Sequence, residues 1–395
     1  MSAHDQGSLA RRLYAARAIV VLALLTTLVI ARGLFLEHAL FGAVPAFPGA
    51  PSWGAPVDVV LLGLIGAAGL AALHPRGGLA ALVCVGLLAL RCVPDRMAWQ
   101  PYLLHYGFAL LALGLAARPQ ADPGRALRAL RWCAAGIYFW SGASKFTATF
   151  LDNGMEQLLP AVVPESWVPG LQSCAIVVPL SEVAFALGLL LPRLRRPAVV
   201  LAIATHLFIL AMIGPTGLSY NHVVWPWNLA MLLLVPLLFW SADESESEAQ
   251  GGSGGLVPAA LGLFWVAPIL GHLGLWNPYL SFKLYTVNFE IGTIYVSPAL
   301  AAKLPETTQA NLQPLAIQRE VEGRAYEFAG FLVVPWWSEA ELSAFAPPSE
   351  AIYVHVLRRL RELADSDRDL LLLIDGIPAW DSTERSTRAV HVDQL

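Results

Sequence analysis

The feature that most constrains this chain is a series of long apolar stretches separated by short polar loops. Hydrophobic residues make up 56% of the 395-residue sequence and charged residues only 14%, a balance unlike that of a water-soluble domain. Roughly 17 to 25 apolar residues are enough for a helix to cross a bilayer. We identify nine candidate spans, near residues 18–36, 57–74, 78–93, 101–117, 130–147, 171–191, 197–213, 224–240 and 256–274. The sequence therefore predicts an all-α polytopic membrane protein with about nine transmembrane helices.

Arginine is concentrated in alternate loops. Three arginines precede the first span, four lie between residues 118 and 131, and three lie between residues 193 and 196. The opposite loops, 37–56, 148–170 and 214–223, contain neither lysine nor arginine. The positive-inside rule then predicts a cytoplasmic N-terminus in a bacterial-type inner membrane and, with an odd number of spans, a periplasmic C-terminal segment. The loop that contains Arg91, Asp95 and Arg96 is the one weak exception to this pattern.

Composition divides the chain into four parts. Residues 1–240 contain spans one to eight, and residues 241–255 are acidic and then rich in Gly and Ser, which is typical of a flexible linker. Residues 256–274 are the last span. Residues 275–395 have the composition of a small external α+β domain.

Within that domain the sequence predicts two strands, a helix and a further strand. Tyr285–Val296 and Tyr326–Val334 are rich in residues that favour extended structure. Ser349 is suited to cap a helix whose apolar stripe continues to Leu363. Leu370–Ile374 then has the character of a buried strand. None of these features predicts a function for the domain.

Polar residues inside the predicted spans are the candidate functional residues. An ammonium group is costly in hydrocarbon, so Lys145 near the end of the fifth span is either functional or snorkels to the headgroups. Tyr138, Ser141 and Lys145 are spaced to share one helical face, and Gly142 allows a neighbouring backbone or a ligand to approach. Helical rise places Lys145 about 21 Å from the arginine at position 131, and His105 on the fourth span lies at a similar depth.

Glu182 on the sixth span and His206 on the seventh lie nearer the predicted midplane. If Glu182 reaches Lys145, the two form a structural salt bridge and the lysine stays charged. If Lys145 instead lies in an apolar pocket, desolvation can release a free amine that serves as a general base. His206 is interpreted either as part of the site or as a histidine that bonds two helices together.

A further polar group follows in the next loop and span. Asn221, His222, Trp227 and Asn228 are candidate substrate contacts, although the aromatic residues also suit a membrane-interface belt. The four cysteines form no CxxC pattern, and we expect no metal site. We also expect no nucleic-acid partner.

The segment Tyr138–Phe146, followed by Phe150–Met155, resembles the stretch around the catalytic lysine of vitamin K-dependent γ-glutamyl carboxylases and, more broadly, the HTTM family of bacterial membrane proteins. The resemblance covers roughly residues 10–275, and Gly142-x-x-Lys145 is its specific motif. His206 is similar to the histidine of a later helix of the family. The asparagine that precedes the family's histidine in the fourth span is replaced here by Leu104, beside His105.

The resemblance implies a membrane enzyme that acts on a reduced lipid quinone, such as reduced vitamin K or menaquinol. It implies Lys145 as the base, His105 as the supporting histidine, and O₂ and CO₂ as co-reactants. A protein or peptide acceptor, carboxylated at a glutamyl or other group, would bind at the external face. The predicted external domain is shorter than that of the animal enzymes, so quinol chemistry is better supported than carboxylation.

Two alternatives come from other classes of protein. A DoxX-like, non-catalytic membrane subunit of a redox system would tolerate loss of Lys145. A proton-coupled transporter would depend on Glu182 and His206, although the sequence lacks the internal repeats that are common in such proteins.

Overall fold

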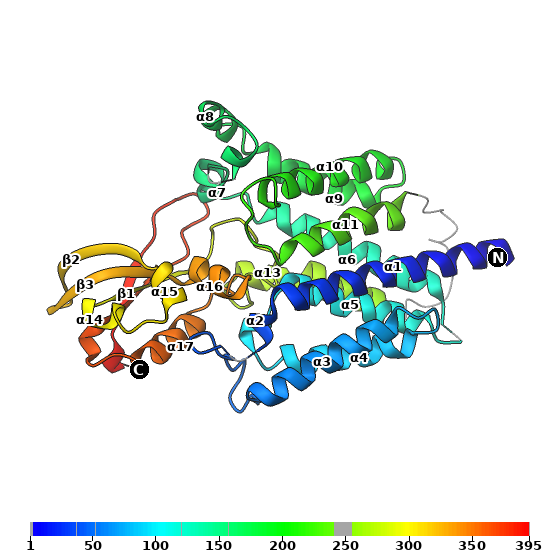
Figure 1. Cartoon of the computed structure of the whole chain (residues 1–395). Helices are drawn as coiled ribbons and strands as arrows, with labels where there is room; N and C mark the ends of the chain where they lie inside the picture. The colour runs from blue at the N-terminus through cyan, green and yellow to red at the C-terminus, as the bar shows by residue number, and fades with distance from the viewer. Residues whose placement is uncertain are drawn as a thin grey trace.

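The computed structural model describes residues 3–36, 38–51, 53–119, 121–156, 158–240 and 255–394. It consists of a helical domain and a smaller C-terminal domain that contains a sheet (Figure 1). The N-terminus lies at the end of the helical domain that is remote from the sheet. The predicted linker at 241–255 falls almost entirely outside the described residues.

The helical domain is built from helices whose positions follow the apolar stretches. They are α1 (Ala3–Ile30), α2 (Arg32–Phe35), α3 (Ala55–Ala72), α4 (Gly78–Cys92), α5 (Pro101–Ala116), α6 (Pro123–Ala143), α7 (Ala148–Asn153), α8 (Val168–Gln172), α9 (Val177–Leu190), α10 (Arg195–Ile213), α11 (Val224–Phe239), α12 (Leu256–Leu261) and α13 (Ala267–His272). A π-helical turn, Gly262–Val266, joins α12 to α13.

The lengths of these helices do not support nine spans. Among the described residues, only Gly7–Ile30, α3 and α10 are long and apolar enough to cross a membrane, and the pair Glu165–Gln172 and Val177–Leu190, bent by 63°, could be a fourth span. Helices α4, α5 and α11 and the segment Leu256–His272 have 15–17 residues, or about 23–26 Å of helix, which is less than a hydrocarbon core of about 30 Å. Helix α6 is longer but contains three arginines.

The C-terminal domain contains an antiparallel five-stranded sheet in the order β2-β3-β1-β4-β5. The strands are β1 (Ile291–Val296), β2 (Gln313–Val321), β3 (Arg324–Val333), β4 (Leu370–Asp375) and β5 (Thr387–Val390). Four short helices accompany them: α14 (Pro298–Ala301), α15 (Glu306–Ala310), α16 (Val334–Leu342) and α17 (Glu350–Arg361). Alternate residues of β1 are buried, as expected for a strand with one covered face.

Most of the elements predicted for this domain are present. Strands β3 and β4 and helix α17 lie where the pattern placed them, and Ser349 occupies the N-cap position of α17, although its side chain makes no capping hydrogen bond. The predicted first strand was too long, because β1 begins only at Ile291. Tyr285 and Val287 have φ of +58° and +51°, a left-handed conformation that no strand adopts.

The two domains are packed against each other through α16. Trp337 of α16 is buried, and its ring centroid lies 4.5 Å from that of Phe41. Glu341 of the same helix lies 3.2 Å from Nε2 of His38. At a separate point, the backbone N–H of Ala148 donates to the carbonyl of Trp380 at 2.8 Å. The C-terminal domain is therefore held to one end of the helical domain rather than tethered at a distance.

A buried ionic network joins α3, α4 and the loop after α4. Arg91 Nε lies 3.1 Å from Asp58 Oδ1, and Arg91 Nη1 donates to Asp95 Oδ2 at 2.8 Å. The carbonyl of Phe35 accepts two further hydrogen bonds from Arg91. All three charged side chains are at most 7% exposed. Arg91, part of the exception to the arginine pattern, is thus neutralised inside the protein.

We predict that Arg91→Met destabilises the protein by about 3–5 kcal/mol, because two buried carboxylates lose their cation. Thermal or denaturant unfolding in detergent measures the change. Lys303→Met is the control, since Lys303 and its partner Asp365 are 43% and 69% exposed and such a pair contributes at most about 1 kcal/mol. Equal losses in the two variants would contradict the proposed network.

Candidate functional site

A cavity of about 340 Å³ lies between α6, α9, α10 and α11. Its walls are mainly apolar and include Phe185, Ile209, Met212 and Met231. A volume in the low hundreds of Å³, with few polar groups on apolar walls, is typical of small-molecule sites. Several residues predicted from the sequence line it: Tyr138, Ser141, Lys145, Glu182, His206, Trp227 and Asn228.

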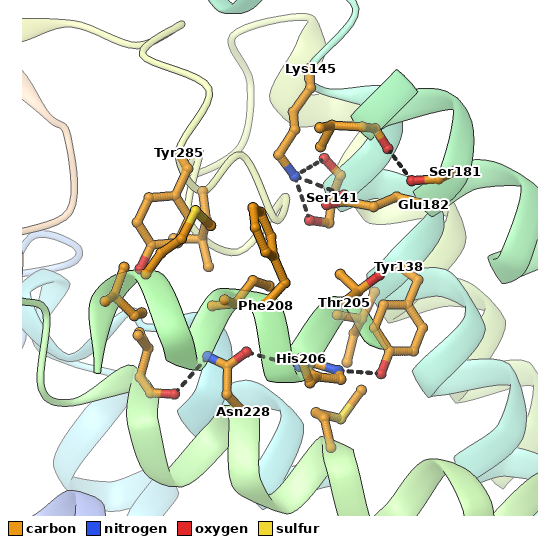
Figure 2. A pocket seen from close by; sticks show the side chains of 18 of the residues that line it. Tyr138, Ser141, Lys145, Ser181, Glu182, Thr205, His206, Phe208, Asn228 and Tyr285 are labelled. Carbon is orange, nitrogen blue, oxygen red and sulfur yellow. Dashed lines mark hydrogen bonds and ion pairs between the residues drawn. The ribbon is translucent and has the colours of Figure 1, made fainter. Parts of the chain in front are cut away.

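Lys145 and Glu182 form an ion pair on one wall of this cavity. Lys145 lies just beyond the end of α6, and its Nζ donates to Glu182 Oε2 at 2.7 Å (Figure 2). It also donates to the carbonyl and the hydroxyl of Ser141, at 2.9 and 3.0 Å. Because an ammonium group has three N–H donors, this geometry uses all of them. The structure therefore favours the salt-bridge interpretation over an unpaired amine.

Gly142 allows α6 and α9 to approach closely enough for this pair to form. A Cβ at position 142 would lie 2.8 Å from Glu182 Cβ and 3.0 Å from the carbonyl oxygen of Pro179. The first of these contacts is shorter than Cβ atoms show in real structures, and the second is tighter than most. Gly142 thus admits the backbone of α9 rather than a ligand. This close approach brings the Glu182 carboxylate within reach of Lys145, although the sequence predicted different depths for Glu182 and Lys145.

A second polar group is formed by Tyr138, His206 and Asn228. Asn228 Nδ2 donates to the carbonyl of Val224 at 2.9 Å, so its Oδ1 is the acceptor for His206 Nδ1–H at 2.8 Å. His206 Nε2 then accepts from the Tyr138 hydroxyl at 2.6 Å. One chain of hydrogen bonds therefore connects α6, α10 and α11. Figure 2 shows this group and the Lys145 group on two sides of the cavity, with Phe208 between them.

His105 does not join these groups. It is 3% exposed, and its Nδ1 accepts a hydrogen bond from Trp227 Nε1 at 3.1 Å. Trp227 lines the cavity, whereas His105 lies behind it and is not among the lining residues. The similar depth of His105 and Lys145 along their helices did not place them in one site, because depth says nothing about the direction in which each side chain points.

The roof of the cavity comes from a segment that the sequence analysis did not identify. Residues 274–290, between α13 and β1, form this roof segment, and Phe282, Leu284 and Tyr285 line the cavity. Phe282, Tyr285 and Val287 all have positive φ, a conformation that costs about 1–3 kcal/mol per non-glycine residue. Arg385 opposes that cost by donating to the carbonyls of Val287 and Phe289. No local pattern in the sequence marks these residues.

Asn221 and His222 support the roof instead of lining the cavity. Asn221 Nδ2 donates to the Tyr285 hydroxyl at 2.7 Å, and its backbone N–H donates to Glu339 Oε1 of α16 at 2.9 Å. His222 Nδ1 lies 3.7 Å from the same carboxylate oxygen. Helix α16 of the C-terminal domain is thereby connected, through Asn221, to a residue of the cavity roof.

The roof segment also contains a second buried lysine. Lys283 is 4% exposed, and its Nζ donates to the carbonyl of Gly271 at 3.1 Å. Burial lowers the pKa of Lys283 from its usual value. Lys283 does not line the cavity, so the candidate site keeps Lys145 as its lysine. Within the described residues, no group of three or more His, Cys, Asp and Glu side chains is arranged to hold a metal ion.

We predict that Lys145→Met destabilises the protein by about 3–5 kcal/mol, because Glu182 is left buried without its cation. Adding Glu182→Met should recover most of the loss, since a buried ion pair can often be replaced by apolar side chains at little cost. Unfolding in detergent, analysed as a double-mutant cycle, measures the coupling. A double variant as unstable as the single one would show that the loss has another cause.

We predict that the stability of the protein depends on pH through the carboxyl group of Glu339. Burial raises the pKa of Glu339 above its reference value of 4.5, and the Asn221 N–H and His222 oppose this in part. The folded state then binds the proton more tightly than the unfolded state, so this contribution to stability falls as pH rises from about 4.5. Glu339→Gln removes the titration, and its stability relative to wild type should rise over that range. Melting temperatures from about pH 4.5 to 7 test this, with exposed Glu320→Gln as control; a flat difference for Glu339→Gln would contradict it.

Comparisons with protein-family models, with curated proteins and with solved structures found no match. The resemblance to the carboxylase and HTTM families therefore stays a hypothesis that rests on the residues around Lys145.

Proposed function

We propose that this chain is an integral membrane enzyme of the carboxylase and HTTM type that binds a reduced lipid quinone in the cavity beside Lys145 and Glu182. The observation that carries the proposal is a buried lysine–carboxylate pair at the wall of an apolar cavity. Apolar and aromatic walls suit a quinone ring and its hydrocarbon tail, and the few polar groups suit its two hydroxyls.

The proposed topology keeps the N-terminus in the cytoplasm and the C-terminal domain in the periplasm. The apolar helices would then cross or enter the bilayer. The separation of the N-terminus from the sheet in Figure 1 supports this arrangement, as does the alternation of arginine-rich loops.

The residues of the cavity suggest a division of tasks. Glu182 Oε2 is occupied by Lys145, whereas Glu182 Oε1 receives no hydrogen bond from the described residues. A hydroxyl at this position would donate to Oε1, and Glu182 could then accept its proton while Lys145 holds the carboxylate in place. Lys145 would thus act with Glu182 rather than as a free amine. Tyr138 and His206 would orient the opposite side of the ligand.

When bound, a reduced quinone would supply the reducing equivalents. The overall reaction consumes one hydroquinone and one O₂ and gives one quinone epoxide and one water. Coupling to CO₂ fixation on a glutamyl or other acceptor is the further step that the resemblance implies. The roof segment, Trp227 and Phe208 would exclude water from the reacting group.

The test is epoxide formation by the full chain reconstituted with reduced vitamin K or menaquinol in air-saturated buffer. We expect epoxide from wild type and at least about a 100-fold loss in Lys145→Met/Glu182→Met, a loss typical of removing general acid–base catalysis. Chromatography with mass detection measures the product. Added labelled CO₂ and a glutamyl peptide test the coupled carboxylation.

The control for this experiment is Lys303→Met, which removes an exposed lysine of the C-terminal domain and should keep full activity. Unfolding of the double variant must show that it is folded. Absence of epoxide from wild type with every quinol, or full activity in the folded double variant, would reject the proposal.

One observation favours a second candidate. Glu182 and His206 line the same cavity, as a proton-coupled transporter would require. Such a protein would show flux driven by a pH gradient in proteoliposomes, lost in Glu182→Met, and would form no epoxide.

A further inference from the structure

A second cavity lies where the two domains meet, apart from the site beside Lys145. This interdomain cleft has a volume of about 1040 Å³. One wall comes from a loop of the helical domain, with Arg96 and Trp99, and from the roof segment, with Trp276. The other comes mainly from α17 and includes His355 and Arg358. None of these residues lines the first cavity.

The wall of the helical domain presents an ordered cation. Arg96 donates to the carbonyls of Pro45 and Ala46 at 3.1 and 3.2 Å. Its guanidinium carbon lies 5.7 Å from the centre of the Trp99 ring, and Trp99 stacks on Trp276 with centroids 6.5 Å apart. The stacked rings and the backbone contacts restrict Arg96, so little side-chain freedom would be lost when an anion binds.

The same cleft contains polar groups that have no partner. The indole Nε1 of Trp276 and Nε2 of His355 are buried and make no hydrogen bond within the described part of the chain. Arg358 is exposed and makes no hydrogen bond or ion pair with the described residues. Buried polar atoms are almost always paired in folded proteins. An indole N–H can only donate, so a ligand that satisfies Trp276 must bring an acceptor.

The charges of the cleft favour one negative charge on that ligand. Glu290 and Glu350 also line it, but Arg388 lies 2.5 Å from Glu350 and offsets its charge. Burial lowers the pKa of His355, so the ring counts as neutral. The positive charges of Arg96 and Arg358 and the negative charge of Glu290 then sum to one net positive charge in the cleft.

The mouth of the cleft is apolar. Leu275 and Ile377 both line it and are 72% and 46% exposed. An exposed apolar rim around a polar interior suits an amphiphile whose charged head enters while its hydrocarbon stays outside. In the proposed topology this rim faces the outer leaflet, where aromatic residues such as Trp99 and Trp276 are commonly found.

We propose that the interdomain cleft binds the phosphodiester head group of a monoanionic phospholipid, with Arg96 and Arg358 contacting the phosphate and Trp276 donating to one of its oxygens. This inference gives a role to Arg96, which the positive-inside pattern leaves as an exception. It concerns a site other than the quinone cavity, and it could be correct even if no quinol is a substrate.

The test compares lipids retained by the full chain in nanodiscs of mixed phosphatidylglycerol and phosphatidylcholine. Native mass spectrometry of the protein released from them should show preferential retention of phosphatidylglycerol by wild type. Arg358→Met should weaken that preference by about tenfold, because the cleft loses one positive charge. Trp276→Phe should weaken the retention of phosphatidylglycerol itself by about tenfold, the effect of losing one hydrogen bond to a charged group. Trp276→Phe keeps an aromatic ring and removes only the N–H donor.

Arg319→Gln is the matched control, because Arg319 is an exposed arginine of β2 that does not line the cleft. Equal retention of both lipids by wild type, or an equal loss of preference in Arg319→Gln, would overturn the proposal. Soluble glycerophosphoglycerol, the phosphodiester head group of phosphatidylglycerol without its acyl chains, is added as a competitor: failure to displace the lipid supports a lipid ligand. Complete displacement at low concentration would instead show that the cleft binds a free phosphodiester, and it would overturn the proposal of a lipid ligand.

Discussion

Charged groups inside the helical domain have to be paired, and this requirement shapes how its helices are arranged. An isolated ion in an apolar interior is far more costly than a hydrogen-bonded pair. Lys145 therefore brings α9 to the end of α6, and Arg91 brings two aspartates and a backbone carbonyl together around α4. Each network joins segments that are distant in the sequence and so restricts how the helices between them can pack.

The candidate site depends on this pairing. The approach of α9 that allows Glu182 to reach Lys145 is possible only because position 142 has no Cβ. The opposite wall is set by the hydrogen bonds of His206, and the roof by a strained segment that Arg385 and Asn221 hold in place. The C-terminal domain thus contributes to the cavity, both through the roof segment that leads into its sheet and through Glu339 of α16.

The residues predicted for the site divide according to the kind of evidence that identified them. Lys145, Glu182 and His206 were recognised because polar groups within apolar stretches are costly, and that cost applies wherever the helices lie. His105 was assigned from its depth and from the resemblance, and Asn221 and His222 from their position in a loop. None of these three lines the cavity. Phe208 and Tyr285 were not identified, because an aromatic side chain has no reason to stand out among many apolar neighbours.

The sequence by itself determined the approximate positions of the main apolar helices. It also determined that such helices dominate the N-terminal two-thirds and that the C-terminal part is a small mixed domain. These features follow from local composition and periodicity. The sequence also identified Lys145, Glu182 and His206 as ionisable side chains inside the helical domain. Only the tertiary structure decided that Lys145 is paired with Glu182, that His105 lies behind the cavity, and that residues 274–290 cover it. Those outcomes depend on the rotation of each helix about its axis and on contacts between distant segments, neither of which local sequence specifies.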